Sequence, residues 1–157
     1  MTDIKLLVLD VDGTMTDGKV YIGENGELFK AFDIKDGLGI HNILPANGIV
    51  PAIITGRKSV MLEKRCREIG ISHLHQGVSD KIKCMDELLE ALELTYENCA
   101  YMGDDINDLA CMEKVAVVGC PADAVDAVKK IADYVASRNG GNGAVREFIE
   151  WLCRKED

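Results

Sequence analysis

The chain alternates between short apolar runs and longer segments in which apolar residues recur at helical spacing. An apolar run that stops at charge or glycine is typical of a strand buried on both faces of a parallel sheet. Four such runs lie at 4–9, 49–54, 99–102 and 115–119. Segments with helical spacing lie at 37–46, 58–69, 80–93, 106–113, 123–131 and 143–154. The alternation predicts an α/β fold, with a Rossmann-like parallel sheet covered by helices on both faces.

One segment departs from this alternation. Residues 19–32 predict two short strands around an Asn25-Gly26 turn, because this dipeptide favours tight hairpins. The rest of the sequence contains neither an internal repeat nor a low-complexity linker. We therefore expect a single domain over residues 1–157, with a β-hairpin inserted after the first strand.

The composition is that of an ordinary folded domain. The 157 residues are 47% hydrophobic and 29% charged, far from the composition of disordered chains. A formal net charge of −9 argues against binding to nucleic acid or to an anionic membrane, because both need clustered lysine and arginine. The apolar run near Met1 is too short for a signal sequence or a membrane span. The six cysteines form no CxxC pair, which favours a reduced, cytoplasmic protein.

Polar side chains follow three of the predicted strands. Ligands of an open parallel sheet bind beyond the carboxyl ends of its strands. Asp10 and Asp12 follow the first strand, 55–58 (TGRK) the second and 103–108 (GDDIND) the third. Carboxylates crowded at one apolar edge must take up a proton or hold a cation, and oxygen donors without nearby Cys or His favour Mg²⁺. The pattern predicts a magnesium site, the alternative being that these aspartates only cap a loop and a helix.

Cations at the starts of two predicted helices point to an anion. Lys81 falls in the first turn of its helix, and Arg57 and Lys58 lie at the start of another. The helix dipole disfavours a cation there unless an anion lies nearby. A phosphate would accept hydrogen bonds from the Thr55 hydroxyl, the Lys81 ammonium and free backbone N–H groups. Each cation taken alone is also compatible with a plain surface position.

These pieces resemble, in order and spacing, the four signature motifs of the haloacid dehalogenase-like phosphohydrolase superfamily. The motifs are DVDGT at 10–14, Thr55-Gly56, Lys81 and GDDIND at 103–108. The resemblance implies that Asp10 is the nucleophile that becomes an aspartyl phosphate. It implies that Asp12 protonates the leaving alkoxide and then deprotonates water. The implied magnesium ligands are Asp10, the backbone carbonyl of Asp12, and Asp104. The implied phosphate-binding residues are Gly13, Thr55, Gly56 and Lys81, and the implied supporting residues are Asp105, Asn107 and Asp108.

A closer resemblance extends over most of the chain. The sequence looks like the small phosphatases that release 3-deoxy-D-manno-octulosonate from its 8-phosphate. The segments that carry it are DVDGTMTDG (10–18), the hairpin, KDGLGI (35–40), TGRKS (55–59), QGVSDK (76–81) and GGNGAVREF (140–148). Those phosphatases lack a cap domain, and here too the spacing between motifs leaves no room for one. In that family the hairpins associate in a homotetramer and neighbouring chains cover each active site. The alternative is a hairpin that folds back on its own sheet.

The implied substrate is a small-molecule sugar phosphate, 3-deoxy-D-manno-octulosonate 8-phosphate. Relatives of this fold also hydrolyse nonulosonate 9-phosphates, but the octulosonate branch usually has Arg where this chain has Arg57. Arg65 and Arg146 are further candidate substrate-binding residues. The alternatives are a solvated ion pair between Arg65 and Glu68, and a plain loop and helix start around Arg146.

Two other functions remain as rivals to a phosphatase. One is a catalytically idle assembly module of the same fold. The other is a phosphotransferase or mutase, which would have to keep water away from the aspartyl phosphate. His73 and His75 have no third ligand nearby and fit a surface strand better than a metal pair.

Overall fold

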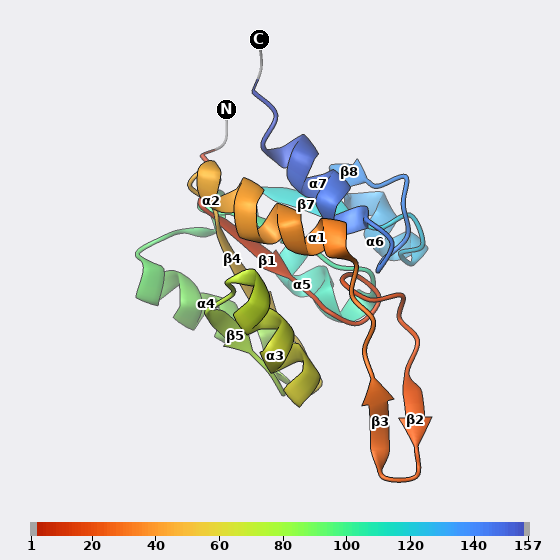
Figure 1. The fold of residues 1–157 in the computed structure, drawn as a ribbon. Coiled ribbons are helices and arrows are strands. Elements are labelled where there is room, and N and C mark those ends of the chain that lie inside the picture. The colour runs from red at the N-terminus through yellow and green to blue at the C-terminus, as the bar shows by residue number, and fades with distance from the viewer. Residues whose placement is uncertain (1–2, 156–157) are drawn as a thin grey trace.

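The computed structural model describes residues 3–155, which form a six-stranded parallel sheet between two layers of helices (Figure 1). The strand order β5-β4-β1-β6-β7-β8 places β1 beside β4 and β6. The strands are β1 (Leu6–Leu9), β4 (Val50–Ile54), β5 (His73–His75), β6 (Cys99–Met102), β7 (Val117–Cys120) and β8 (Tyr134–Val135). The predicted parallel sheet is confirmed. The additional strand β8 escapes prediction because its two residues form no apolar run.

Helices cover both faces of this sheet, as predicted. One layer consists of α1 (Ile34–Leu38), the π-helix η1 (Gly39–Ile43), α2 (Leu44–Ala46), α3 (Val60–Ile69) and α7 (Ala144–Leu152). The other consists of α4 (Lys81–Leu92), α5 (Leu109–Met112) and α6 (Asp126–Ile131). Two 3₁₀ turns, η2 (Tyr96–Asn98) and η3 (Ile106–Asp108), precede β6 and α5.

Strand β1 is apolar throughout because it is buried on both faces. Successive side chains of a strand point to opposite sides. Leu7 and Leu9 pack into the cluster under α3 and α7, whereas Leu6 and Val8 pack into the cluster under α4 and α5. Burying each of these side chains contributes about 1.5–3 kcal/mol. The strand is thereby held rigidly, and so is the loop that leaves its carboxyl end.

Two helix starts matter for the site. Lys81 is the first residue of α4, where the Asp80 side chain accepts a hydrogen bond from the Lys83 N–H at 3.0 Å. Helix α3 begins only at Val60, because Ser59 is its N-cap. The expectation that Arg57 and Lys58 begin this helix is therefore wrong, and both lie in the loop after β4.

The hairpin projects away from the body of the molecule as a separate two-stranded sheet of β2 (Tyr21–Gly23) and β3 (Gly26–Phe29) (Figure 1). Gly23 pairs with Gly26, so the turn residues are Glu24 and Asn25 rather than the predicted Asn25 and Gly26. The predicted dipeptide turn needs positive φ at both central residues. Here Gly26 takes that conformation, with φ +117°, while Asn25 does not. The hairpin itself is confirmed and its turn lies one residue earlier.

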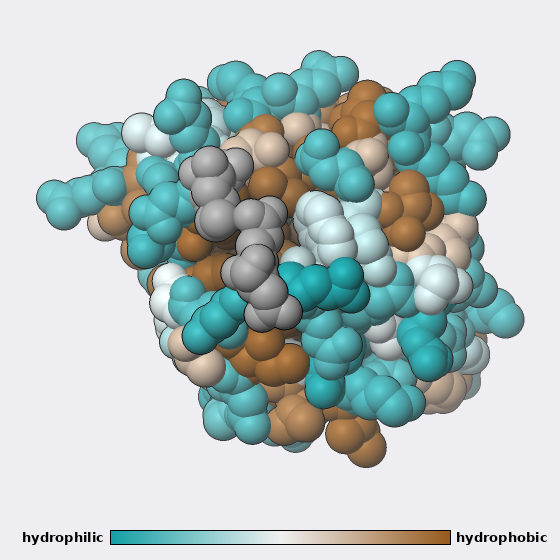
Figure 2. All heavy atoms as spheres, turned by 90° about the horizontal axis from the view of Figure 1, so that it is seen from above, coloured by the Kyte–Doolittle hydropathy of each residue, from teal (hydrophilic) through white to brown (hydrophobic). Residues whose placement is uncertain are grey.

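The end of the molecule opposite the hairpin carries the two chain ends. Hydrophilic side chains cover most of that face, with hydrophobic ones interspersed (Figure 2). Within residues 3–155, none of the helices has the length and apolar character needed to cross a membrane.

Candidate active site

The turn after β1 fixes the first carboxylates at the edge of the sheet. The Asp10 N–H donates to the Met102 carbonyl of β6 at 3.0 Å, so Asp10 continues the sheet register. The Val11 carbonyl then accepts hydrogen bonds from three following N–H groups at 2.9 to 3.1 Å, which closes a tight turn. Gly13 has φ +89° in this turn, and a Cβ there would overlap the Asp104 carboxylate. Only glycine fits both the backbone conformation and the close approach.

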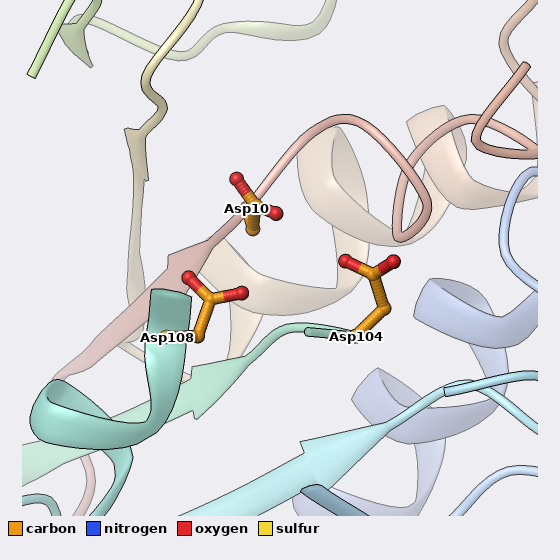
Figure 3. A group of neighbouring side chains, drawn as sticks. All are labelled: Asp10, Asp104 and Asp108. Carbon is orange, nitrogen blue, oxygen red and sulfur yellow. The ribbon is translucent and has the colours of Figure 1, made fainter. Parts of the chain in front are cut away.

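Three carboxylates converge from two neighbouring strand ends (Figure 3). Asp10 follows β1, while Asp104 and Asp108 follow β6, and one oxygen of each lies within 4.8 Å of the others. Burial, followed by the charge of Asp108, raises the pKa of Asp10 to about 7. Burial and the same neighbour raise the pKa of Asp104 to about 6. The cluster therefore resists carrying its full negative charge.

Lys81 partly neutralises this cluster. Its ammonium nitrogen lies 2.8 Å from Asp108 Oδ1 and 3.3 Å from Asp10 Oδ1, with the side chain 8% exposed. Burial alone would lower the pKa of Lys81, but the charges of Asp10 and Asp108 outweigh it and raise that pKa. The buried Tyr101 hydroxyl donates to the same Asp108 oxygen at 2.7 Å. Lys81 is thus a fixed cation beside Asp10, at the start of α4.

The carboxylate group fits a hard divalent cation. Its donors are all oxygens, and Asp108 Oδ2 is buried without a hydrogen-bond partner among residues 3–155. A bound dication would favour the charged forms of Asp10 and Asp104, whose raised pKa values reflect crowding. The sequence predicts Asp108 only as a supporting residue, whereas the structure places it within the donor group. Coordination by the Asp12 carbonyl stays a prediction.

A pocket of about 490 Å³ opens beside these carboxylates, large enough for a small sugar phosphate. It brings together most of the site residues that the sequence predicts, namely Asp10, Asp12, Thr55, Gly56, Arg57, Asp104, Asp105 and Asn107. Gly18 and Val20, at the base of the hairpin, form part of its wall. Lys81 and Asp108 adjoin the pocket through their contacts with Asp10 and Asp104 rather than lining it.

Thr55 and Arg57 reach the pocket from the loop after β4. The Thr55 N–H donates to the His75 carbonyl at 2.9 Å, and its carbonyl accepts from the Val78 N–H at 3.1 Å. These bonds hold buried Thr55 firmly at the sheet edge. The Arg57 side chain is half-exposed, and its guanidinium lies 3.9 Å from the Glu27 carboxylate of the hairpin. Arg57 thus places a half-exposed cation at the wall of the pocket.

Arg65 lies outside the residues that line the pocket. Its guanidinium donates to the Asp33 carbonyl at 3.3 Å and to the Glu68 carboxylate at 3.2 Å, and it lies 5.8 Å from the centre of the Phe32 ring. The sequence leaves open two roles for Arg65, substrate binding and an ion pair with Glu68, and the structure shows the ion pair. These contacts fasten the chain after the hairpin to α3, and a role of Arg65 in substrate binding stays a prediction.

Arg146 also lies outside that pocket. Its Nε donates to Glu150 at 2.7 Å, and its terminal nitrogen donates to the Lys35 carbonyl at 3.2 Å. Its backbone N–H donates to buried Asp36 at 2.9 Å. Arg146 thus joins α7 to α1 within the chain, and its predicted contact with substrate remains untested.

Three residues of the site carry no signal in the sequence. The sequence pattern identifies Tyr101 only as part of an apolar strand, although its hydroxyl donates a hydrogen bond to Asp108. Lys30 and Glu27 read as polar positions of a hairpin, but Lys30 forms an ion pair with Asp12 at 2.8 Å and with Glu27 at 3.1 Å. A buried cation beside a predicted catalytic aspartate becomes visible only in the fold.

The sequence of this chain is similar to those of known phosphatases. The haloacid dehalogenase-like hydrolase family matches residues 72–149. The 3-deoxy-D-manno-octulosonate 8-phosphate phosphatase KdsC of Escherichia coli K12 is 49% identical over 150 residues, covering 96% of this chain and 79% of the relative. The KdsC of Yersinia pestis is 43% identical over 155 residues, covering 99% of this chain and 82% of the relative.

Solved structures agree with the sequence comparison. The crystal structure of the Yersinia pestis phosphatase has a TM-score of 0.91 and 44% identity, covering 97% of this chain and 83% of that one. The Moraxella catarrhalis phosphatase was solved with magnesium, phosphate and 3-deoxy-D-manno-octulosonate (KDO). It has a TM-score of 0.91 and 39% identity, covering 96% of this chain and 86% of that one. With its parallel sheet and convergent carboxylates, the chain therefore belongs to the 3-deoxy-D-manno-octulosonate 8-phosphate phosphatase family of haloacid dehalogenase-like hydrolases.

Proposed function

We propose that the protein is a magnesium-dependent phosphomonoesterase that hydrolyses 3-deoxy-D-manno-octulosonate (KDO) 8-phosphate to KDO and phosphate. The observation that carries this proposal is the buried pairing of Lys81 with Asp10, next to carboxylates suited to a divalent cation. The relatives named for this reaction support the choice of substrate, as does the neighbour that holds magnesium, phosphate and KDO.

Asp10 and Asp12 divide the chemistry in this proposal. An oxygen of Asp10 attacks phosphorus and the bond from phosphorus to the sugar oxygen breaks, while Asp12 donates a proton to that oxygen. Asp12 then takes a proton from water, whose oxygen attacks the aspartyl phosphate, so that phosphate leaves and Asp10 is restored. Two displacements replace one very slow reaction, which lowers the barrier.

The residues around Asp10 offset the repulsion between its carboxylate and the phosphate. Lys81 lies beside Asp10 Oδ1, and the Thr55 hydroxyl and the backbone at Gly56, which line the pocket, would bind phosphoryl oxygens. The Gly13 N–H donates to Thr16 Oγ1 at 3.2 Å, so the proposed contribution of Gly13 is the room it leaves for the Asp104 carboxylate. A magnesium ion would be held by Asp10 and Asp104, with the Asp12 carbonyl and Asp108 adjacent. When bound, magnesium supplies a positive charge that stabilises the transferring phosphoryl group.

Arg57 is the proposed contact for the sugar carboxylate. It lines the pocket from the loop after β4, and its half-exposed guanidinium has the flat, two-pronged geometry that suits a carboxylate. Arg65 and Arg146 are proposed as further contacts for the sugar acid, although in this chain their side chains bind Glu68 and Glu150 outside the pocket lining. The alternative substrate is a nonulosonate 9-phosphate.

A steady-state comparison tests the proposed function. We expect the highest kcat/KM with KDO 8-phosphate, a lower value with nonulosonate 9-phosphates and the lowest with hexose phosphates, all requiring Mg²⁺. A wide margin in favour of a hexose phosphate would overturn the proposed substrate. Release of no phosphate from any sugar phosphate would instead support an idle assembly module, and a bisphosphate intermediate would support a mutase.

We also propose that four chains associate through their hairpins and close one another's pockets. Ile22 and Leu28 are 75% and 63% exposed, although a hairpin of this size is barely stable alone. We expect Ile22→Asp to reduce the mass in sedimentation equilibrium from four chains to one, and to lower kcat/KM for the sugar phosphate. Val60→Asp, at an apolar residue that is 64% exposed at the start of α3 and does not line the pocket, serves as the control for mass. An unchanged mass would contradict assembly through the hairpin.

The remaining proposals concern the chain as a whole. Residues 1–157 are proposed to fold as one domain, since the described segments between the motifs contain only the hairpin and elements of the sheet and helix layers. A cytoplasmic location is proposed because all six cysteines are free thiols and five of them are buried, as suits a reducing compartment.

A further inference from the structure

Lys30 is a buried cation on an otherwise exposed hairpin. It directly follows β3, and its side chain is only 3% exposed, whereas the neighbouring Phe29 is 48% exposed. The ammonium nitrogen lies 2.8 Å from Asp12 Oδ1 and 3.1 Å from Glu27 Oε2. The base of the hairpin therefore turns its one buried charge toward Asp12 while the tip faces outward.

Two carboxylates hold this ammonium in place. A buried lysine is costly unless it is paired, and both partners of Lys30 lie within hydrogen-bond distance. Glu27 comes from the same hairpin and Asp12 from the turn after β1, so the ion pair crosses between the two regions. Electrostatic attraction is strong where water is largely excluded. Lys30 thereby restrains Asp12 from the side of the hairpin.

The restraint leaves the reactive part of Asp12 free. Lys30 binds Oδ1, and among residues 3–155 none donates a hydrogen bond to Oδ2. Asp12 lines the pocket together with Asp10. A carboxyl group that must give a proton to a leaving oxygen and then take one from water depends on exact placement relative to both. One Asp12 oxygen is held and the other has no donor among the described residues, which suits this task.

We propose that Lys30 is a positioning residue for Asp12, and that Glu27 holds Lys30 in place. The inference rests on the proposed function, because it takes Asp12 as the group that protonates the leaving oxygen. The hairpin then contributes to the chemistry of its own chain, in addition to any contact that it makes with another chain.

Substrates with different leaving groups separate positioning from a structural role. An alkyl phosphate such as KDO 8-phosphate needs a proton on its leaving oxygen, whereas p-nitrophenyl phosphate releases a stable phenolate. We expect Lys30→Met to lower kcat/KM for the alkyl phosphate at least tenfold, out of the roughly 10²–10⁴-fold that general acid–base catalysis contributes. The same variant should change kcat/KM for the aryl phosphate little.

The ratio of the two kcat/KM values is the decisive readout. Both substrates are measured on one preparation, so a smaller fraction of folded enzyme lowers both values equally and leaves the ratio unchanged. Sedimentation equilibrium checks that the variant keeps the mass of the unaltered protein. Glu27 also lies 3.9 Å from Arg57, so Glu27→Gln is tested with a hexose phosphate, which has no carboxylate, against p-nitrophenyl phosphate. This variant, which keeps Lys30 but loosens it, should shift that ratio in the same direction by less. Lys19→Met, at an exposed lysine of the same hairpin, is the matched control and should leave the ratio unchanged.

Two results would overturn the inference. Equal losses with both substrates would make Lys30 a structural or phosphate-binding residue, and no loss with either would remove it from the reaction. The proposed function is judged separately, from the substrate preference and magnesium requirement of the unaltered protein. If another alkyl phosphate proves the better substrate, it replaces KDO 8-phosphate in the ratio and the test of Lys30 still applies.

Discussion

The loop after β1 connects the carboxyl edge of the sheet to the hairpin, and the two regions differ in how far a single chain buries their side chains. At the sheet edge, Asp10, Lys81 and Asp108 are buried and paired with one another. At the hairpin tip, Ile22 and Leu28 are exposed apolar side chains. Folding of one chain therefore builds the chemical groups of the site, whereas burial of the hairpin requires a second surface.

The boundary between these regions lies at the base of the hairpin. Lys30 and Glu27 belong to the hairpin by sequence, but their charges face Asp12 and Arg57. The hairpin is thus divided into a base that belongs with the site and a tip suited to assembly. Substitutions on the two sides of this boundary should therefore differ in their effects, and the largest effect is expected at the sheet edge.

Asp10→Asn tests whether the sheet edge carries the chemistry. An amide is a poor nucleophile, so turnover should fall by on the order of 10⁴-fold or more, the scale seen when other covalent mechanisms lose their nucleophile. The fold should persist, because the variant removes one of several crowded carboxylates. Phosphate release and thermal unfolding measure the two effects. Asp17→Asn, at an exposed aspartate in the same loop, is the control, and full activity in Asp10→Asn would refute the assignment.

The same truncation should destabilise the chain strongly in the sheet and only slightly at the hairpin tip. Ile53→Ala in β4 removes a fully buried side chain and should lower the free energy of unfolding by about 2–5 kcal/mol. Ile22→Ala at the hairpin tip should have little effect when measured by denaturant unfolding at low protein concentration. A growing effect of Ile22→Ala at higher concentration would show coupling of stability to assembly. Equal losses at low concentration would mean that the tip is packed within its own chain.

Asp36 lies on α1, which follows the hairpin in the chain, and its carboxylate accepts a hydrogen bond from the Arg146 N–H of α7. It therefore tests the packing between the end of the hairpin and the helix layer. Burial raises the pKa of Asp36 from 3.8 to about 6, so the fold disfavours its charged form. Its contribution to stability is fully present below pH 3.8 and is lost as pH rises through about 6. Between pH 4 and 7 the free energy of unfolding of the wild type should fall more than that of Asp36→Asn. The difference between the two falls should be at most about 3 kcal/mol.

Denaturant unfolding at several pH values, with Mg²⁺ present, measures that difference. The metal should suppress the titration of Asp10 and Asp104, whose raised pKa values fall in the same range. Parallel pH profiles for wild type and Asp36→Asn would contradict the prediction. Asp33→Asn is an unsuitable control because its side chain caps α1, so exposed Asp126→Asn is used instead.

Tyr101→Phe should have the smallest effect. It removes one hydrogen bond to Asp108 but leaves the Lys81 contact to the same oxygen intact. We expect the free energy of unfolding to fall by about 1.5 kcal/mol, as for a hydrogen bond to a charged acceptor. Tyr21→Phe in the hairpin, whose hydroxyl is exposed, should change it little. Equal values for both variants would contradict a preorganised network beneath the sheet edge.

The sequence by itself determined the parallel sheet, the hairpin and the order of the strand-end motifs. Those features depend on local pattern: β1 is apolar at every position because both its faces are buried, and parallel strands bring their carboxyl ends to one edge. The sequence pattern alone therefore places Asp10, Thr55 and Asp104 together at one edge of the sheet. The family resemblance then supplied the expected role of each, which pattern alone does not.

Only the tertiary structure decided which charges meet. It placed Asp108 in the donor group, Lys30 against Asp12, and Arg65 and Arg146 on contacts away from the pocket. It also moved the hairpin turn to Glu24 and Asn25 and began α3 after Arg57 and Lys58. Lys81 and Asp10 are 71 positions apart, and no local periodicity relates them. Such pairs follow from how buried helices and strands pack, because a buried charge takes its partner from whatever element the fold brings beside it.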